Sequence, residues 1–371
     1  MGNKNSNKQN IKLIDNKNEL HSLLTRNYIS DISILYNYEK KYEGISDKNI
    51  KNNEISDNFI FIICGLIDGF IEIYNTEFKL SLNFKAHRDM ISKIIQLKKS
   101  GNILTSSYDN SLKIFKLSRN CTEENLIYTF YLNPAFNRIQ DIIQINNDDI
   151  LLISVLNHII YFPLNHNKLS ENKINLSDYL YSKYEHGKKF LNNLLEINKK
   201  LFLALDDTEN RLLFFKLIPS ENNIENITLL KNILVFSEQK NDKNIYSKIC
   251  IENLSPKYNF ILVSANKYIN IIDIKYLEIV SIHEMDMEAL YFFYNSNIDR
   301  IIIFEGDNIF KYKIDEERFN FSFLRENKQT VEINYNLGLE TIRKSIYNPL
   351  NYNIVYFFYK KFLMKIELDF T

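Results

Sequence analysis

The segment Ala86–Leu117 constrains the fold of this 371-residue chain more than any other part of it. Hydrophobic residues form a first strand-like run at Ile91–Leu97 and a second at Ile103–Ser106, and Leu112–Phe115 then alternates apolar with polar side chains, as a half-buried strand does. Polar turns separate the three runs. Because a unit of this kind cannot bury both of its faces alone, we expect the rest of the chain to supply sister units.

This segment resembles a repeat of the WD-repeat (WD40) β-propeller family. Members of that family end each repeat in Trp-Asp and hold its strands together through a His, a Ser or Thr, an Asp and a Trp. His87, Thr105 and Asp109 match the first three residues, and Phe115 stands at the Trp position. Phe has no N–H to donate, so the hydrogen-bonded set is incomplete, and the chain contains no Trp at all. The resemblance implies that His87 and Asp109 are structural residues of the repeat and not catalytic ones.

Six weaker units surround this segment, and together they predict an all-β, seven-bladed β-propeller. Blades of about 42 residues would use the length of the chain with a tail to spare. The apolar runs are five to eight residues long and show no sustained 3.6-residue period, which excludes an array of helices. The predicted strands of the six other units are Tyr28–Tyr36, Asn58–Cys64 and Phe70–Tyr74; Ile139–Ile145, Ile150–Leu156 and His158–Phe162; Phe190–Ile197, Lys200–Leu205 and Arg211–Leu217; Ile245–Glu252, Asn259–Ser264 and Tyr268–Ile274; Met287–Tyr294, Arg300–Glu305 and Ile309–Ile314; Leu339–Ile346, Asn353–Tyr359 and Lys361–Leu368.

The two ends of the chain are predicted to close the ring. An outer strand is expected after most units, with Lys173–Leu176 as the weakest assignment, in the third blade, but the seventh unit ends almost at the C-terminus. We expect Asn10–Asp15, an alternating apolar stretch, to pair with this last blade, because closure leaves no open sheet edge. Residues 1–9 would then form a flexible tail and residues 10–371 the propeller. The charged segment Asn37–Asp57 is predicted to be a mobile insertion.

Composition and motifs argue against several functional classes. Basic and acidic residues balance at 46 each, so no nucleic-acid partner is expected. The three cysteines are too far apart for a metal site, and neither a hydrolase nor a nucleotide-binding motif accompanies the six scattered histidines. We therefore predict a protein that is not an enzyme and holds no metal or cofactor. A hydrophilic N-terminus and the lack of an 18-residue apolar run favour the cytoplasm.

The N-terminus, Met-Gly-Asn-Lys-Asn-Ser, matches the N-myristoylation pattern, with Gly2 as the residue that would be acylated. A single myristoyl chain binds membranes only marginally, with an association constant on the order of 10⁴ M⁻¹, and no cysteine adjoins Gly2 to carry a second lipid. Lys4 and Lys8 add some attraction to anionic lipid. The pattern therefore predicts reversible, peripheral attachment to the cytosolic face of a membrane.

Closure at Asn10–Asp15 would leave a tether of about nine residues, at most roughly 30 Å long. The face that carries the first-to-second-strand loops, and with them residues 37–57, would then lie near the membrane. By resemblance to WD-repeat proteins, the opposite face would present Arg88 and Tyr108 to protein partners.

Three functional hypotheses follow from these features. The first is a non-catalytic scaffold for protein–protein interaction, associated reversibly with a membrane through Gly2. The second is a phosphoinositide-binding propeller of the autophagy type, but the Arg-Arg-Gly motif of that family is missing, and the nearest basic pair is Arg343-Lys344. The third is a soluble subunit of a larger cytosolic complex. No motif identifies the partner.

Overall fold

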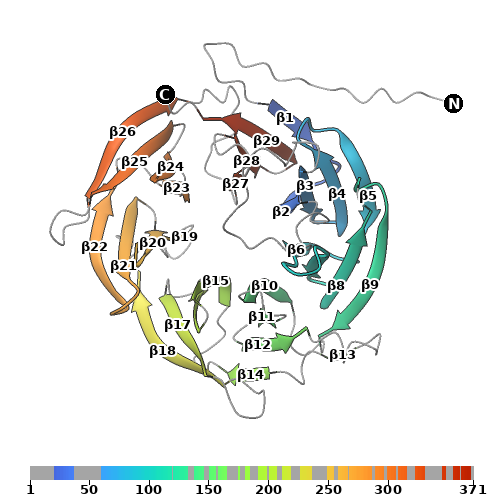
Figure 1. Ribbon diagram of the computed structural model, residues 1–371, viewed down its shortest axis with the longest axis horizontal. Coiled ribbons are helices and arrows are strands. Elements are labelled where there is room, and N and C mark those ends of the chain that lie inside the picture. The colour runs from blue at the N-terminus through green and yellow to red at the C-terminus, as the bar shows by residue number, and fades with distance from the viewer. Residues whose placement is uncertain are drawn as a thin grey trace, which may run out of the picture.

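Seven β-sheets form a closed ring in the computed structural model, so the predicted all-β, seven-bladed propeller is confirmed (Figure 1). Six sheets have four strands and one has five. The structure describes residues 21–36, 60–118, 120–132, 138–145, 150–155, 158–164, 174–175, 180–183, 191–198, 200–206, 211–218, 226–235, 249–254, 258–265, 267–285, 289–295, 299–305, 308–315, 322–330, 345–347, 354–359 and 361–368. Gly2, Asn10–Asp15 and Asn37–Asp57 lie outside these residues.

The first three blades follow the predicted order of strands from the centre to the rim. Blade 1 contains β2 (Ile29–Tyr36), β3 (Ile60–Leu66), β4 (Phe70–Asn75) and β5 (Leu80–Lys85). Blade 2 contains β6 (Ile91–Gln96), β7 (Ile103–Ser107), β8 (Ser111–Leu117) and β9 (Glu124–Tyr131), with β13 (Ile174–Asn175) added outside β9. Blade 3 contains β10 (Ile139–Ile145), β11 (Ile150–Val155), β12 (His158–Pro163) and β14 (Leu180–Lys183).

The remaining blades complete the ring in chain order. Blade 4 contains β15 (Leu191–Asn198), β16 (Leu201–Asp206), β17 (Arg211–Ile218) and β18 (Asn226–Leu234). Blade 5 contains β19 (Ile249–Asn253), β20 (Phe260–Ala265), β21 (Tyr268–Asp273) and β22 (Glu278–Glu284). Blade 6 contains β23 (Ala289–Asn295), β24 (Arg300–Glu305), β25 (Asn308–Asp315) and β26 (Ser322–Thr330). Blade 7 contains β27 (Ser345–Tyr347), β28 (Ile354–Tyr359), β29 (Phe362–Glu367) and β1 (His21–Leu24).

The two ends of the chain do close the ring, but through a different segment from the one predicted. The strand that pairs with β29 is β1, in a register that joins His21 to Lys365 and Leu24 to Phe362, and not Asn10–Asp15 (Figure 1). Connection length explains the difference, because four residues separate β1 from β2 and five separate β5 from β6. A closing strand at residues 10–15 would need a much longer connection to reach β2.

The outer strand of blade 3 also differs from the prediction. The strand that pairs with β12 is β14, whereas Ile174 and Asn175 of β13 pair in parallel with Phe130 and Tyr131 of β9 in blade 2. The described part of the predicted segment Lys173–Leu176, Ile174 and Asn175, therefore contributes to the neighbouring blade. An outer strand leaves unpaired backbone groups along its free edge, and β13 occupies part of that edge on β9.

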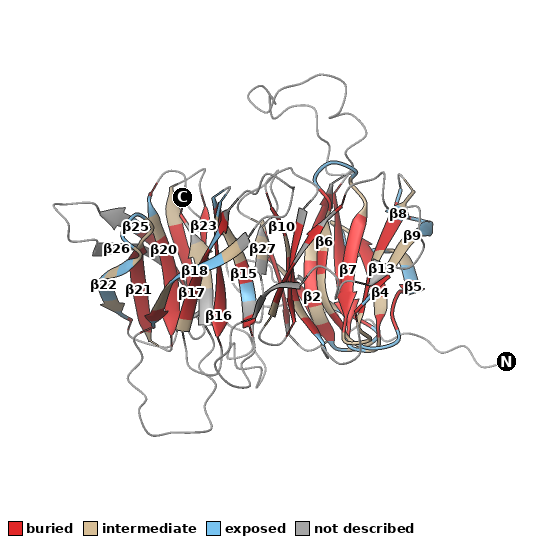
Figure 2. Ribbon diagram, turned by 90° about the horizontal axis from the view of Figure 1, so that it is seen from below, coloured by how far each residue is buried: buried red, intermediate tan, exposed pale blue. Residues whose placement is uncertain are grey.

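The hydrophobic core consists of seven clusters, each shared by two neighbouring blades, and the buried residues line the inner strands of the ring (Figure 2). Between blades 1 and 2, for example, Phe115 packs edge-on against Phe84, with ring centroids 5.2 Å apart. The aromatic ring at the Trp position therefore still fills the space between two sheets.

Candidate functional site

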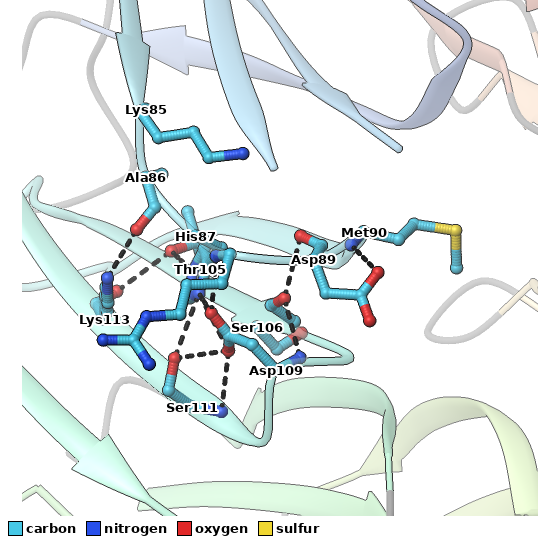
Figure 3. A network of polar contacts seen from close by, with 12 residues as sticks. Lys85, Ala86, His87, Asp89, Met90, Thr105, Ser106, Asp109, Ser111 and Lys113 are labelled. Atoms are coloured by element: carbon cyan, nitrogen blue, oxygen red, sulfur yellow. Dashed lines mark hydrogen bonds and ion pairs between the residues drawn. The ribbon is translucent and has the colours of Figure 1, made fainter. Parts of the chain in front are cut away.

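A buried polar network in blade 2 brings together the residues that the sequence singled out. His87 lies in the connection between β5 and β6, Thr105 lies on β7, and Asp109 lies in the turn between β7 and β8 (Figure 3). The Nδ1 atom of His87 is 3.1 Å from Asp109 Oδ2, and its Nε2 atom is 2.8 Å from Thr105 Oγ1. Ser111, which the sequence analysis did not single out, adds a hydroxyl 3.0 Å from the same Nδ1 atom.

The carboxylate of Asp109 joins the connection between two blades to the turn within one of them. It accepts hydrogen bonds from the backbone N–H of Arg88 at 2.9 Å, from the backbone N–H of Ser111 at 3.0 Å and from the Ser111 hydroxyl at 2.6 Å. A backbone hydrogen bond from Tyr108 N–H to the carbonyl of Met90, at 2.9 Å, holds the same two segments together. The backbone beneath Arg88 and Tyr108 is therefore fixed on both sides.

The network favours a neutral imidazole beside an ionised carboxylate. Burial lowers the pKa of His87, and the opposing effect of Asp109 does not restore it. Burial alone would raise the pKa of Asp109, but hydrogen bonds from His87, Ser111 and Arg88 N–H outweigh it and hold that pKa well below its usual value. In this state Nδ1–H of His87 donates to the carboxylate, and Nε2 accepts from the Thr105 hydroxyl.

The order Thr105–His87–Asp109 matches the hydroxyl, base and orienting acid of a catalytic triad, but the site lacks the access that a triad needs. His87 is 1% exposed and Thr105 is 0% exposed, so no substrate carbonyl can reach the hydroxyl. Both ring nitrogens of His87 already have partners inside the blade. The geometry therefore gives these residues a structural role in holding the loop.

Phe115 supplies no counterpart of the Trp donor in the WD-repeat pattern. Its ring lies in the core between blades 1 and 2, and it offers no donor to Thr105. The Thr105 hydroxyl instead lies 3.4 Å from the backbone carbonyl of Lys113, which is a weak contact compared with its 2.8 Å bond to His87. The hydrogen-bonded set therefore lacks the Trp donor of the WD-repeat pattern.

Blade 1 shows how the same positions are filled without a histidine. Cys64 pairs with Glu72 across β3 and β4, as Thr105 pairs with Lys113 across β7 and β8, and both Gly69 and Asn110 have positive φ in the following turn. Asp68, the counterpart of Asp109, forms an ion pair with Arg26 Nε at 3.2 Å. In the turn, an exposed ion pair takes the place of the buried network, while inside the blade Glu72 accepts a hydrogen bond from the Tyr74 hydroxyl at 2.6 Å.

Carboxylates on the inner strands join neighbouring blades, and the sequence analysis missed them. Asp31 Oδ2 of blade 1 accepts a hydrogen bond from Ile94 N–H of blade 2, and Asp141 Oδ2 of blade 3 accepts one from Leu194 N–H of blade 4, each at 2.8 Å. Lys93 of blade 2 forms an ion pair with the other oxygen of Asp141, also at 2.8 Å. The recurring patterns Ile-Ser-Asp-Ile, Ile-Ser-Lys-Ile and Ile-Gln-Asp-Ile at the starts of β2, β6 and β10 were the signal that could have revealed these residues.

Arg88 and Tyr108 lie at one end of the ring, which we call the Arg88 face. It carries the β1–β2 and β5–β6 connections and the β3–β4 and β7–β8 turns. Arg88 is exposed, and Tyr108 is half-buried beneath the guanidinium of Arg138, whose central carbon is 4.7 Å from the ring centroid. The opposite end carries the β6–β7 turn and the ends of β2 and β3 that flank residues 37–59.

The part of the chain that the structure describes contains neither a cluster of metal-binding side chains nor a helix that could span a membrane. Within it, no group of three or more His, Cys, Asp or Glu residues is placed to hold a metal ion. Among the same residues, none belongs to a helix long and apolar enough to cross a membrane.

Comparison with known proteins shows the fold alone. No protein-family model and no curated protein sequence matches the chain. Among solved structures, the crystal structure of Saccharomyces cerevisiae Sqt1 is similar, with a TM-score of 0.57 and 9% sequence identity over 83% of this chain and 81% of that one. The shared fold is a β-propeller.

Proposed function

We propose that the protein is a non-catalytic scaffold of the WD-repeat type, which binds other proteins on the Arg88 face. The observation that supports this function most directly is the position of Arg88. Its backbone N–H is held by the buried Asp109 carboxylate at 2.9 Å, while its side chain is exposed. A binding surface built on a fixed backbone loses little conformational entropy when a partner binds.

The second part of the proposal is reversible membrane attachment through a myristoyl group on Gly2. Its support is the N-terminal pattern Met-Gly-Asn-Lys-Asn-Ser, which ends at Ser6 as the acyltransferase motif requires. The position of β1 changes the geometry of this attachment. Because the ring begins at His21, the 19 residue steps from Gly2 can reach at most roughly 65 Å, about twice the tether that the sequence suggested. A tether of this length does not determine which face lies near the membrane.

Metabolic labelling with a myristate analogue tests the lipid. We expect the native protein and an Asn7→Ala control to incorporate label and to be found partly in the membrane fraction. A Gly2→Ala variant should lose both properties, because its N-terminal amine is no longer a substrate. An unlabelled native protein would refute the acylation proposal.

Proximity labelling with the same pair, native protein and Gly2→Ala, tests the scaffold. We expect a defined set of labelled proteins that an Arg88→Glu variant reduces. If the set is identical for the native protein and the Gly2→Ala variant, the protein is a soluble subunit of a cytosolic complex. If no protein is enriched over a free-label control, the scaffold proposal is wrong.

A further inference from the structure

Basic side chains gather on the Arg88 face where blades 1 and 2 meet. The central guanidinium carbon of Arg26 lies 3.5 Å from the centroid of the Phe70 ring, and Lys85 Nζ lies 4.9 Å from the same centroid. On blade 2, burial lowers the pKa of Lys113, the nearby Asp109 carboxylate opposes this effect, and the guanidinium of Arg88 adds to it. Two pairs of like charges are thus held close together.

Asp68 forms an ion pair with Arg26, but among the described residues neither Lys85 nor Arg88 forms an ion pair with a carboxylate. Asp109 is committed to the buried network, and Asp68 Oδ2 accepts from Arg26 Nε at 3.2 Å. Lys85 donates to the backbone carbonyl of Asp68 and not to a carboxylate. Among the described residues, no carboxylate forms an ion pair with the exposed guanidinium of Arg88. Lys85 and Arg88 are therefore exposed cations without an ion pair among the described residues, and Asp89 is the exposed carboxylate on the same connection.

The connection that carries Lys85 and Arg88 is held in place from both blades. The N–H groups of Ala86 and His87 donate to the carbonyl of Gly69 at 3.0 and 2.9 Å, and Arg88 N–H donates to Asp109. Figure 3 shows this connection passing over the network, with Lys85 and Lys113 on either side of His87. The backbone positions that carry Lys85 and Arg88 are therefore set before any ligand binds.

From these contacts we infer that the junction of blades 1 and 2 on the Arg88 face binds an acidic segment of a partner protein, with its carboxylates on Lys85 and Arg88. This inference rests on the proposed scaffold function and adds the chemistry of the partner. The exposed side chain of Ile67, in the β3–β4 turn beside Asp68, suits a segment that also carries a hydrophobic residue.

A protein partner suits this surface better than a lipid bilayer. Membrane-binding surfaces insert free aromatic side chains at the interface, but here the rings are covered by cations. Phe70 lies beneath Arg26, and Tyr28 lies 5.3 Å from Lys361 Nζ. Such rings are held in place by their cations and are not available for insertion.

Binding of acidic peptides to the purified, non-acylated full-length protein tests the inference. The probes are two fluorescein-labelled pools of decapeptides, one with four Asp or Glu residues among Leu, Phe and Ser, the other with Asn and Gln in their place. We expect the acidic pool to bind at least about tenfold more tightly by fluorescence anisotropy, and the difference to shrink as salt rises from low to high ionic strength.

Charge-reversal variants locate the site. Arg88→Glu is expected to weaken binding of the acidic pool by about tenfold. The loop should stay folded, since the Arg88 side chain forms no ion pair among the described residues whose loss would unfold it. Lys267→Glu is the matched control, because Lys267 lies in the β20–β21 turn of blade 5 on the same face and is paired with Glu284 at 2.6 Å. This control should bind the acidic pool as the native protein does, and circular dichroism should show all three proteins folded.

Two outcomes would overturn the inference. One is equal binding of both pools, or a loss that Lys267→Glu shows as strongly as Arg88→Glu. The other is binding to vesicles rich in phosphatidylserine that Arg88→Glu abolishes, without any preference for the acidic pool, which would assign the surface to lipid. The scaffold proposal is judged separately, because proximity labelling in cells reports protein partners whatever the charge of the segment that binds.

Discussion

Removal of the Asp109 carboxylate should destabilise the propeller far more than removal of its counterpart in blade 1. Asp109 accepts hydrogen bonds from His87, from Arg88 N–H and from both the N–H and the hydroxyl of Ser111. His87 and Ser111 are each 1% exposed, so their donors would lose a partner away from water. Asp68 stands in the same turn position of blade 1, but its ion-pair partner Arg26 has a side chain that is 45% exposed, and its bond from Phe70 N–H is long, at 3.4 Å.

The expected magnitudes follow from these environments. A buried donor that loses its acceptor costs about 1–3 kcal/mol, and His87 and Ser111 can recover part of this by bonding to each other, so Asp109→Ala should cost about 3–5 kcal/mol. An exposed ion pair is worth at most about 1 kcal/mol, which sets the cost of Asp68→Ala. With an unfolding entropy of about 2.1 cal/mol/K per residue, the 371-residue chain should lose roughly 5 °C in Tm for the first variant and about 1 °C for the second.

Thermal unfolding followed by circular dichroism measures both variants without a tryptophan, which the chain lacks. Asp109→Asn is a useful third protein, since it keeps an oxygen acceptor but loses the charge, and it should fall between the other two. If the two alanine variants shift Tm by the same small amount, the network contributes nothing special to stability and our reasoning about blade 2 is wrong.

Other substitutions test other parts of the ring. Gly69→Ala would place a Cβ atom 2.7 Å from the Asp89 carbonyl oxygen, and nearer still to that of His87, at a φ of +77°. We expect the free energy of unfolding, measured by chemical denaturation, to fall by at least about 2 kcal/mol. An unchanged midpoint would show that the β5–β6 connection can move aside. Asp141→Ala, which leaves Leu194 N–H without its acceptor between blades 3 and 4, should cost about 2–3 kcal/mol in the same assay. A cost below about 0.5 kcal/mol would mean that water replaces the carboxylate. Because burial lowers the pKa of His87, unfolding takes up a proton as pH falls below about 6.5, and the free energy of unfolding should drop there by up to about 1.4 kcal/mol per pH unit. His87→Gln should remove this slope, and parallel pH profiles of the variant and the native protein would contradict the prediction. The pH dependence from Glu252 has the opposite sign, since burial raises its pKa to about 7 and its contribution to the free energy of unfolding declines as pH rises from about 4.5 to 7. Glu252→Gln should therefore gain stability relative to the native protein over that range, and a constant difference between the two proteins would refute the assignment.

Blade 2 shows how much of the fold and of the candidate site was predictable. The strands of this blade lie close to their predicted positions because Ile103–Ser107 and Ser111–Leu117 carry strong apolar patterns, broken by a turn at Asp109. The contacts of His87 with Thr105 and Asp109 follow from the repeat pattern. Ser111 was not predicted, because a lone hydroxyl at the start of a strand has no distinctive pattern.

The closing strand was not predictable from local pattern. His21–Leu24 has only four residues, and its partner β29 begins more than 330 residues later, so nothing in the neighbouring sequence indicates the pair. The strand is recognised only when the length of the β1–β2 connection is compared with that of the β5–β6 connection. The parallel pairing of β13 with β9 is similar, since two residues carry no periodicity.

The sequence by itself determined the all-β class, the approximate number of blades and the positions of most strands, because alternating apolar runs and polar turns are local properties of a chain. Tertiary structure alone decided which segment closes the ring, which blade receives Ile174 and Asn175, and which carboxylates join neighbouring blades. It also decided that Arg26 and Lys85 share the Phe70 ring beside Arg88. These features depend on contacts between distant residues, and they exist only after seven separate sheets have packed around one axis.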